Sequence, residues 1–185
     1  GLGTVVTGGR PDAAQLISCG VSDSATHLKI VDPDTLTAVP DGTIGELWIS
    51  SPSVSPGYFR RPEATAETFG LALAADGRPY MRWGDLGAII DGELYITGRL
   101  KDLIILRGRN IHPNDIEAAV SAFSPAFGVA AAFELSDRSA PVGVVVEYEA
   151  GLSPAGADEL LEQVLDELVR AFSLPAVAVG LVPAG

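Results

Sequence analysis

The sequence predicts an α+β protein: a β-rich part at residues 1–98, followed by a small α+β module at residues 99–185. Two observations lead to this fold class. Short runs of β-branched and aromatic residues, separated by turn signals, fill the first part. A long segment near the C-terminal end instead carries apolar residues at helical spacing. With 47% hydrophobic and 19% charged residues, the 185-residue chain has enough apolar side chains for packed cores.

The first part is expected to form a small antiparallel sheet or barrel. Four runs are typical of strands: HLKIVD (27–32), GELWIS (45–50), GAII (87–90) and ELYIT (93–97). Asp-Gly pairs mark reversals at 41–42, 76–77 and 91–92, and the last of these is typical of a two-residue hairpin turn. A short helix is predicted from Pro62 to Phe69, because proline and acidic residues are favoured in the first turn.

The second module is expected to alternate strands and helices. KDLIILRG (101–108) predicts one strand, and Pro113 begins a helix with Ile116, Val120 and Phe123 on one face. Further strands are predicted at residues 127–133, 142–148 and 176–182, and a loop is predicted at residues 150–157. A helix is predicted over residues 157–172, with an apolar stripe made of Leu161, Val164, Leu165, Leu168 and Phe172. The boundary between the two parts is expected at Gly98 to Lys101.

Composition excludes several classes of function. The net charge of −12 argues against non-specific nucleic-acid binding, which needs a basic face. No run approaches the roughly 20 apolar residues of a membrane span, and the N-terminal sequence lacks the pattern of a signal peptide, so a cytoplasmic location is expected. With one cysteine and two histidines, the chain offers neither a disulfide nor a structural zinc site.

Two residues with reactive side chains are expected to be structural. Cys19 has no basic partner nearby in the sequence, so we expect a small buried residue rather than a nucleophile. His112 precedes Pro113, which favours a position at the start of a helix over a role as a general base.

Four of the twelve lysine and arginine residues lie close together in one stretch. Arg99, Lys101, Arg107 and Arg109 fall within eleven residues, whereas only Arg138 and Arg170 follow them. A local basic loop in an acidic protein indicates one anion site or one ion-pairing hinge.

Asp85 and Arg99 have the chemistry of a nucleotide site. Asp85 is expected in a Gly-flanked turn within YMRWGDLG (80–87), and an ionised carboxylate accepts bonds from both hydroxyls of a ribose. Arg99 lies in ELYITGRLKDLIILRGRNIHPNDIE (93–117), and a guanidinium gives paired, charge-assisted bonds to oxygen acceptors.

GELWISSPSVSPGYFRRPEATAETF (45–69) precedes these two segments, and the three together, in this order, resemble the adenylate-forming superfamily. That superfamily includes acyl- and aryl-CoA ligases, peptide-synthetase adenylation domains and beetle luciferases. KDLIILRGRNIHPNDIE and the ISCG at residues 17–20 are closest to its fatty acyl-AMP ligase branch. The resemblance implies that Asp85 and Arg99 bind nucleotide and that Lys101 is a hinge. Trp83 departs from the pattern, because the family usually has threonine there.

The resemblance also implies that this chain holds the C-terminal part of such an enzyme. Its last residues, LVPAG (181–185), resemble the segment before the family's terminal catalytic lysine. No catalytic residue is therefore expected within the chain, the magnesium ligands are expected outside it, and the chain alone is expected to be inactive.

The implied reaction activates a fatty acid with Mg·ATP to an acyl-adenylate. The acyl group would then pass to an acyl carrier protein, alone or as part of a polyketide or peptide synthase. Two alternatives remain open: an acyl-CoA ligase or peptide-synthetase adenylation domain on the same fold, and a non-catalytic domain that binds a nucleotide or a carrier.

Overall fold

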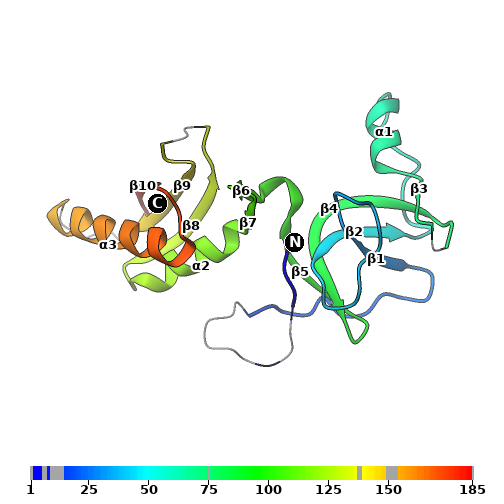
Figure 1. Cartoon of the computed structure of the whole chain (residues 1–185), viewed down its shortest axis with the longest axis horizontal. Coiled ribbons are helices and arrows are strands. Elements are labelled where there is room, and N and C mark those ends of the chain that lie inside the picture. The colour runs from blue at the N-terminus through cyan, green and yellow to red at the C-terminus, as the bar shows by residue number, and fades with distance from the viewer. Residues whose placement is uncertain are drawn as a thin grey trace. The chain divides into compact units, whose positions relative to one another are not determined.

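The computed structural model describes residues 2–5, 8, 15–74, 76–136, 139–148 and 154–184. The chain divides into two compact units, Gly1–Lys101 and Asp102–Gly185 (Figure 1). The boundary predicted from the sequence, between residues 98 and 99, lies three residues earlier, and its assignment to a mobile domain stays a prediction. No helix among the described residues is long and apolar enough to cross a membrane.

The first unit is an antiparallel sheet, as the turn signals predict. Its strands are β1 (His27–Val31), β2 (Gly45–Ser50), β3 (Leu71–Ala72), β4 (Pro79–Ile90) and β5 (Glu93–Arg99). The order is β1-β2-β4-β3, and β5 also pairs with β4. The predicted short helix is present as α1 (Pro62–Thr68).

Strand β4 is longer than the sequence indicates. GAII (87–90) is only its last part, because the strand begins at Pro79 and passes through the segment around Asp85. The expectation that Asp85 lies in a turn is therefore wrong. Asp85 belongs to a strand whose pairing is locally irregular.

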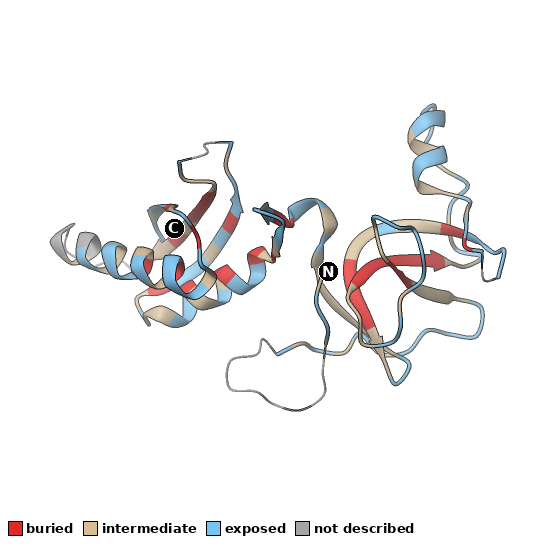
Figure 2. Cartoon of the chain, in the orientation of Figure 1, coloured by how far each residue is buried: buried red, intermediate tan, exposed pale blue. Residues whose placement is uncertain are grey.

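The central strand β2 is buried on both faces. Trp48 belongs to a cluster with Val31, Leu73 and Tyr80, whereas its neighbours Leu47 and Ile49 pack with Ile30 in a second cluster. Successive side chains of a strand point to opposite faces, so one short strand contributes to both clusters. Figure 2 shows this strand as the most continuously buried stretch of the first unit.

The second unit joins a small hairpin to a three-stranded sheet with helices. The 3-10 helix η1 (Leu100–Asp102) leads from the first unit into it. Its elements are β6 (Ile104–Leu106), β7 (Arg109–Ile111), α2 (Pro113–Phe123), β8 (Phe127–Glu134), β9 (Val142–Tyr148), α3 (Pro154–Phe172) and β10 (Val177–Pro183). The sheet order is β10-β9-β8, and β9 pairs parallel with β10, so α3 is the crossover that parallel strands require. The α+β fold class is confirmed.

Two predictions in this unit need correction. KDLIILRG is not one strand: β6 and β7 pair as an antiparallel hairpin that turns at residues 107–108. Helix α3 begins at Pro154, inside the segment predicted to be a loop, of which residues 150–153 lie outside the described part.

The apolar stripe of α3 differs by one residue from the prediction. Leu160, rather than Leu161, packs against the core beside Val164 and Leu168. Residues 160, 164, 168 and 172 follow one another at intervals of four, the spacing that brings side chains to the same helix face.

Cys19 is exposed, so the expectation that it is buried is wrong. Its segment attaches to β5 through the backbone, where the N–H of Cys19 donates to the carbonyl of Leu94 at 2.8 Å. The neighbouring Ser18 is partly buried while Ile17 and Cys19 are exposed, which is the alternation of an extended edge segment. His112 lies where the sequence predicts, as the residue before the first turn of α2.

Candidate functional site

Asp85 and Arg99, the two residues predicted to bind a nucleotide, lie directly opposite each other. They are register partners in the ladder between β4 and β5. The Nε of Arg99 donates to Oδ1 of Asp85 at 3.1 Å. The arginine side chain is 71% exposed and the aspartate side chain 20% exposed. A carboxylate and a guanidinium thus meet at a position that a ligand can approach.

Asp85 ends a bulge in strand β4. Glu46 pairs with Leu86 and Trp48 pairs with Arg82, so Leu47 alone of β2 lies opposite the three β4 residues 83–85. The middle residue, Gly84, has a φ of +84°, a conformation that favours glycine. Bulges break the alternation of a strand and redirect side chains, and they are frequent beside functional sites. Trp83, the residue that departs from the family pattern, is the exposed first member of this bulge.

A buried carboxylate lies beneath the bulge. Glu46 is only 2% exposed, and its carboxylate accepts hydrogen bonds from Nε of Arg82 at 2.9 and 3.1 Å. The Nη2 of Arg82 lies 2.8 Å from Oε2 of the same carboxylate. The indole Nε1 of Trp48 donates to that oxygen at 3.0 Å. A buried charge is tolerated when it is paired and hydrogen-bonded in this way.

Sequence reasoning missed this group of residues. The available signal was a glutamate in the apolar strand GELWIS, because a charged residue in a buried strand requires a partner. The partner, Arg82, is 36 residues away in the chain, and only the pairing of β2 with β4 brings it near.

Lys101 stands apart from the Asp85–Arg99 pair. It is exposed, belongs to η1 and is the last residue of the first unit. Among the described residues, it makes no hydrogen bond or ion pair with Asp85 or Arg99. Its position at the junction of the two units fits a role in the connection rather than in the pair.

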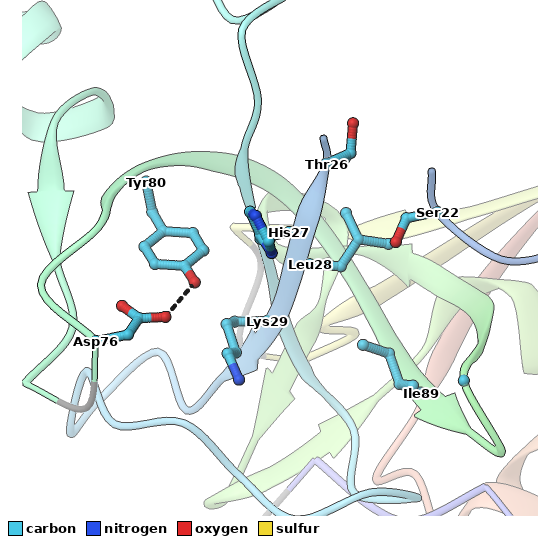
Figure 3. Close-up of a pocket in the computed structure, with 9 residues that line it drawn as sticks. Ser22, Thr26, His27, Leu28, Lys29, Asp76, Tyr80 and Ile89 are labelled. Atoms are coloured by element: carbon cyan, nitrogen blue, oxygen red, sulfur yellow. Dashed lines mark hydrogen bonds between the residues drawn. The ribbon is translucent and has the colours of Figure 1, made fainter. Parts of the chain in front are cut away.

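A shallow pocket of about 270 Å³ lies elsewhere on the first unit, around strand β1 (Figure 3). The hydroxyl of Tyr80 donates to Oδ2 of Asp76 at 2.7 Å within it. This bond, followed by a backbone N–H bond from Arg78, lowers the pKa of Asp76. Burial and the same carboxylate raise the pKa of Tyr80 to about 12. Asp85, Arg99 and Lys101 do not line the pocket, so we do not place the candidate site there.

The described residues contain no group of three or more histidine, cysteine, aspartate or glutamate side chains that could hold a metal ion. Oxygen ligands are what Mg²⁺ requires. Among the described residues no such cluster supplies oxygen ligands, so no magnesium ligand is assigned within this chain.

Comparisons with known proteins found similarity to one family model and to individual ligases. A family model described as AMP-binding enzyme matches residues 2–59. A medium-chain-fatty-acid–[acyl-carrier-protein] ligase of Moorena producens is 38% identical over 176 residues, which are 92% of this chain and 30% of that protein. A putative fatty-acid–CoA ligase of Mycobacterium tuberculosis is 40% identical over 173 residues, 90% of this chain and 28% of that protein.

The fold has a counterpart among solved structures. A structure from a study of fatty acyl-adenylate ligases of E. coli and L. pneumophila aligns with 98% of this chain and 31% of its own, with a TM-score of 0.74 and 30% identity. The chain therefore spans less than a third of the length of the relatives it matches.

Proposed function

This chain is related in sequence and fold to the adenylate-forming ligases, and on that premise we propose that it is the C-terminal part of a fatty acyl-AMP ligase. The proposed enzyme activates a fatty acid with ATP and transfers the acyl group to an acyl carrier protein. This carrier is either a separate protein or part of a polyketide or peptide synthase. The fatty-acid and carrier assignments are supported by the name of the Moorena producens relative. We propose a cytoplasmic location, since this chain, with a single cysteine, has no disulfide framework of the kind typical of secreted proteins.

The pairing of Asp85 with Arg99 is the observation that carries this proposal. Among the described residues, the pair is joined through Oδ1 and Nε, and no other side-chain hydrogen bond reaches either residue. Oδ2 of Asp85 therefore keeps its capacity to accept a ribose hydroxyl, and the two terminal nitrogens of Arg99 keep donors for a nucleotide oxygen. The ion pair holds both groups ready before the nucleotide arrives, which reduces the cost of ordering them.

In the proposed reaction, the fatty carboxylate attacks the α-phosphate of ATP, and acyl-adenylate and pyrophosphate are formed. The residues of this chain contribute position rather than bond-making: Asp85 and Arg99 hold the nucleotide while groups outside the chain act on its phosphates. We further propose that Lys101 is the hinge about which the second unit, Asp102–Gly185, rotates between activation of the acid and transfer of the acyl group.

An acyl-CoA ligase is the second candidate, favoured by the name of the Mycobacterium tuberculosis relative. Both enzymes form the same acyl-adenylate, and they differ in the thiol that receives the acyl group. Incubating the full-length enzyme with radiolabelled fatty acid, ATP and either CoA or a phosphopantetheinylated carrier protein separates them. Label on the carrier supports our proposal, and label on CoA alone contradicts it.

The nucleotide role of Asp85 is tested by Asp85→Asn in the full-length enzyme. The amide replaces one acceptor oxygen by a donor that faces the ribose, and it weakens the ion pair with Arg99. We expect a loss of about 1.5–3 kcal/mol, the range for bonds to charged groups, seen as a roughly 10- to 150-fold fall in kcat/KM for ATP. Unchanged kinetics for ATP would remove Asp85 from the site.

A further inference from the structure

The bulge that carries Asp85 is held at both of its ends by one residue, Glu46. At one end, the backbone of Glu46 is paired with Leu86, the residue directly after Asp85. At the other end, the carboxylate of Glu46 binds the guanidinium of Arg82, the residue directly before the bulge. Glu46 thus spans, with its backbone at one end and its side chain at the other, the three residues 83–85 that lie opposite Leu47 alone.

Trp48 strengthens the same connection from strand β2. It is the register partner of Arg82, and its indole N–H donates to the carboxylate of Glu46 at 3.0 Å. The guanidinium carbon of Arg82 also lies 5.9 Å from the centre of the Trp48 ring. The side chains of Trp48 and Arg82 therefore both bind the buried carboxylate of Glu46, next to the bulge.

We propose that Glu46 is a positioning residue for the nucleotide site, acting through Arg82 and the bulge at residues 83–85 to keep Asp85 opposite Arg99. The inference rests on the proposed function, since it assigns Asp85 to nucleotide binding. The physical reason is the period of a strand: a shift of pairing by one residue sends every side chain to the opposite face. A bulge offers the β2–β4 ladder alternative registers, and the buried carboxylate favours the observed one, in which residues 83–85 leave that ladder and Asp85 lies opposite Arg99 of β5.

A buried ion pair is by itself weak evidence for a gain in stability. The positions of these groups are more informative than their charge, because the pair connects the two flanks of the segment that holds Asp85. Asp85 takes part in no hydrogen bond with Glu46 or Arg82 among the described residues, so Glu46 acts on it only through the backbone.

The test measures ATP binding to the full-length enzyme by titration calorimetry without fatty acid. Glu46→Gln keeps the size of the side chain but removes its charge, and we expect the Kd for ATP to rise about 10- to 100-fold, as for a site misplaced by about an ångström. Tyr80→Phe is the matched control. It also removes a partly buried hydrogen bond from strand β4, three residues before the bulge, but it leaves the contacts of Glu46 with Arg82 in place, and the Kd is expected to stay within about twofold.

A double-mutant cycle separates positioning from general destabilisation. In the Asp85→Asn background, Glu46→Gln is expected to cause no further loss, because its effect passes through Asp85. An equal loss in both backgrounds, or a wild-type Kd for Glu46→Gln, overturns the inference. If Asp85→Asn alone leaves the Kd for ATP unchanged, the proposed nucleotide role of Asp85 fails, and the inference about Glu46 fails with it. If Asp85→Asn raises the Kd but Glu46→Gln does not, only the inference about Glu46 fails.

Should Glu46→Gln fail to fold, Trp48→Phe takes its place. That change removes one of the donors to the same carboxylate and keeps an aromatic ring in the core. A smaller rise in Kd, absent in the Asp85→Asn background, supports the inference. A wild-type Kd for Trp48→Phe overturns it in that case.

Discussion

At the scale of single residues, Tyr80 makes the stability of the first unit depend on pH. It is 1% exposed, and burial, followed by the hydrogen bond to Asp76 and the charge of that carboxylate, raises its pKa from 10.0 to about 12. The folded chain therefore keeps the hydroxyl proton at pH values where the unfolded chain loses it. This contribution to stability is complete below pH 10 and is lost as the pH rises through about 12.

We expect the free energy of unfolding to fall by about 2–3 kcal/mol across this range because of Tyr80 alone, since one pKa unit corresponds to about 1.36 kcal/mol. Urea denaturation at pH 9 and at pH 12 measures it. The Tyr80→Phe variant is the reference, because it keeps every other titrating group, so the difference between its loss of stability and that of the wild type is due to Tyr80. If the variant loses as much stability as the wild type between these pH values, the tyrosine is not the source.

Single residues also show what the sequence does and does not reveal about the site. Asp85 and Arg99 were found because each belongs to a recognisable run, and the structure places them together although their roles stay a prediction. Glu46 and Arg82 were missed because their relation depends on the register of β2 with β4, which no local pattern contains. Cys19 was misjudged because cysteines are usually buried, whereas its edge segment turns it outward.

At the scale of elements, two hairpins explain which turns the sequence predicts. Asp91 and Gly92 have φ values of +51° and +83°, and Arg107 and Gly108 have φ values of +52° and +76°. Both turns need two successive residues with positive φ, for which Asp-Gly is a favoured pair. The first was predicted from that pair. The second turn was predicted to be part of a strand, because an arginine with positive φ is sterically unfavourable and Arg-Gly is not a typical turn pair.

Helix α3 owes its place in the second unit to a stripe that faces the core. Leu168 is 1% exposed, whereas its neighbour Val169 is 36% exposed. Leu168→Ala removes buried methyl groups and leaves a cavity, so we expect a loss of about 2–5 kcal/mol in the free energy of unfolding. Chemical denaturation followed by circular dichroism measures it.

Val169→Ala is the control for helix α3, and a change within about 0.5 kcal/mol is expected for it. Similar losses for both variants would mean that the helix does not bury the face described here. The spacing of the apolar residues correctly predicted the helix. It did not decide between Leu160 and Leu161, because both leucines lie at the edges of the apolar stripe and the pattern allows either of them to face the core.

At the scale of the whole molecule, the junction at Lys101 tests the proposed hinge. Proline fixes φ near −65° and removes the backbone N–H, so Lys101→Pro is expected to restrict rotation in the full-length enzyme. If the resting pose is the one that activates the acid, acyl-adenylate should form at the wild-type rate and transfer to the carrier should slow sharply. Single-turnover measurement of the two half-reactions is the test.

Lys101→Ala controls for the loss of charge at the proposed hinge. An equal effect of proline on both half-reactions, or no effect on either, would leave Lys101 an ordinary connecting residue.

The isolated 185-residue chain is expected to have no adenylation activity. The proposed role of its residues is to hold a nucleotide, and the chain spans less than a third of the length of the ligases it matches, so the groups that act on the phosphates are proposed to lie elsewhere in the enzyme. A pyrophosphate-exchange assay with fatty acid and ATP measures this, with the full-length enzyme as the positive control. Exchange above background by the purified chain would contradict the division of labour proposed for the two parts of the enzyme.

The two separate sets of core residues affect how this chain can change over evolutionary time. One core draws on residues between 104 and 181, and the clusters of the first unit draw on residues between 28 and 96. Substitutions that share no packing partner act independently on stability. Core residues of one unit can therefore be replaced without compensating changes in the core clusters of the other, and genetic recombination at residue 102 would keep each of these clusters intact.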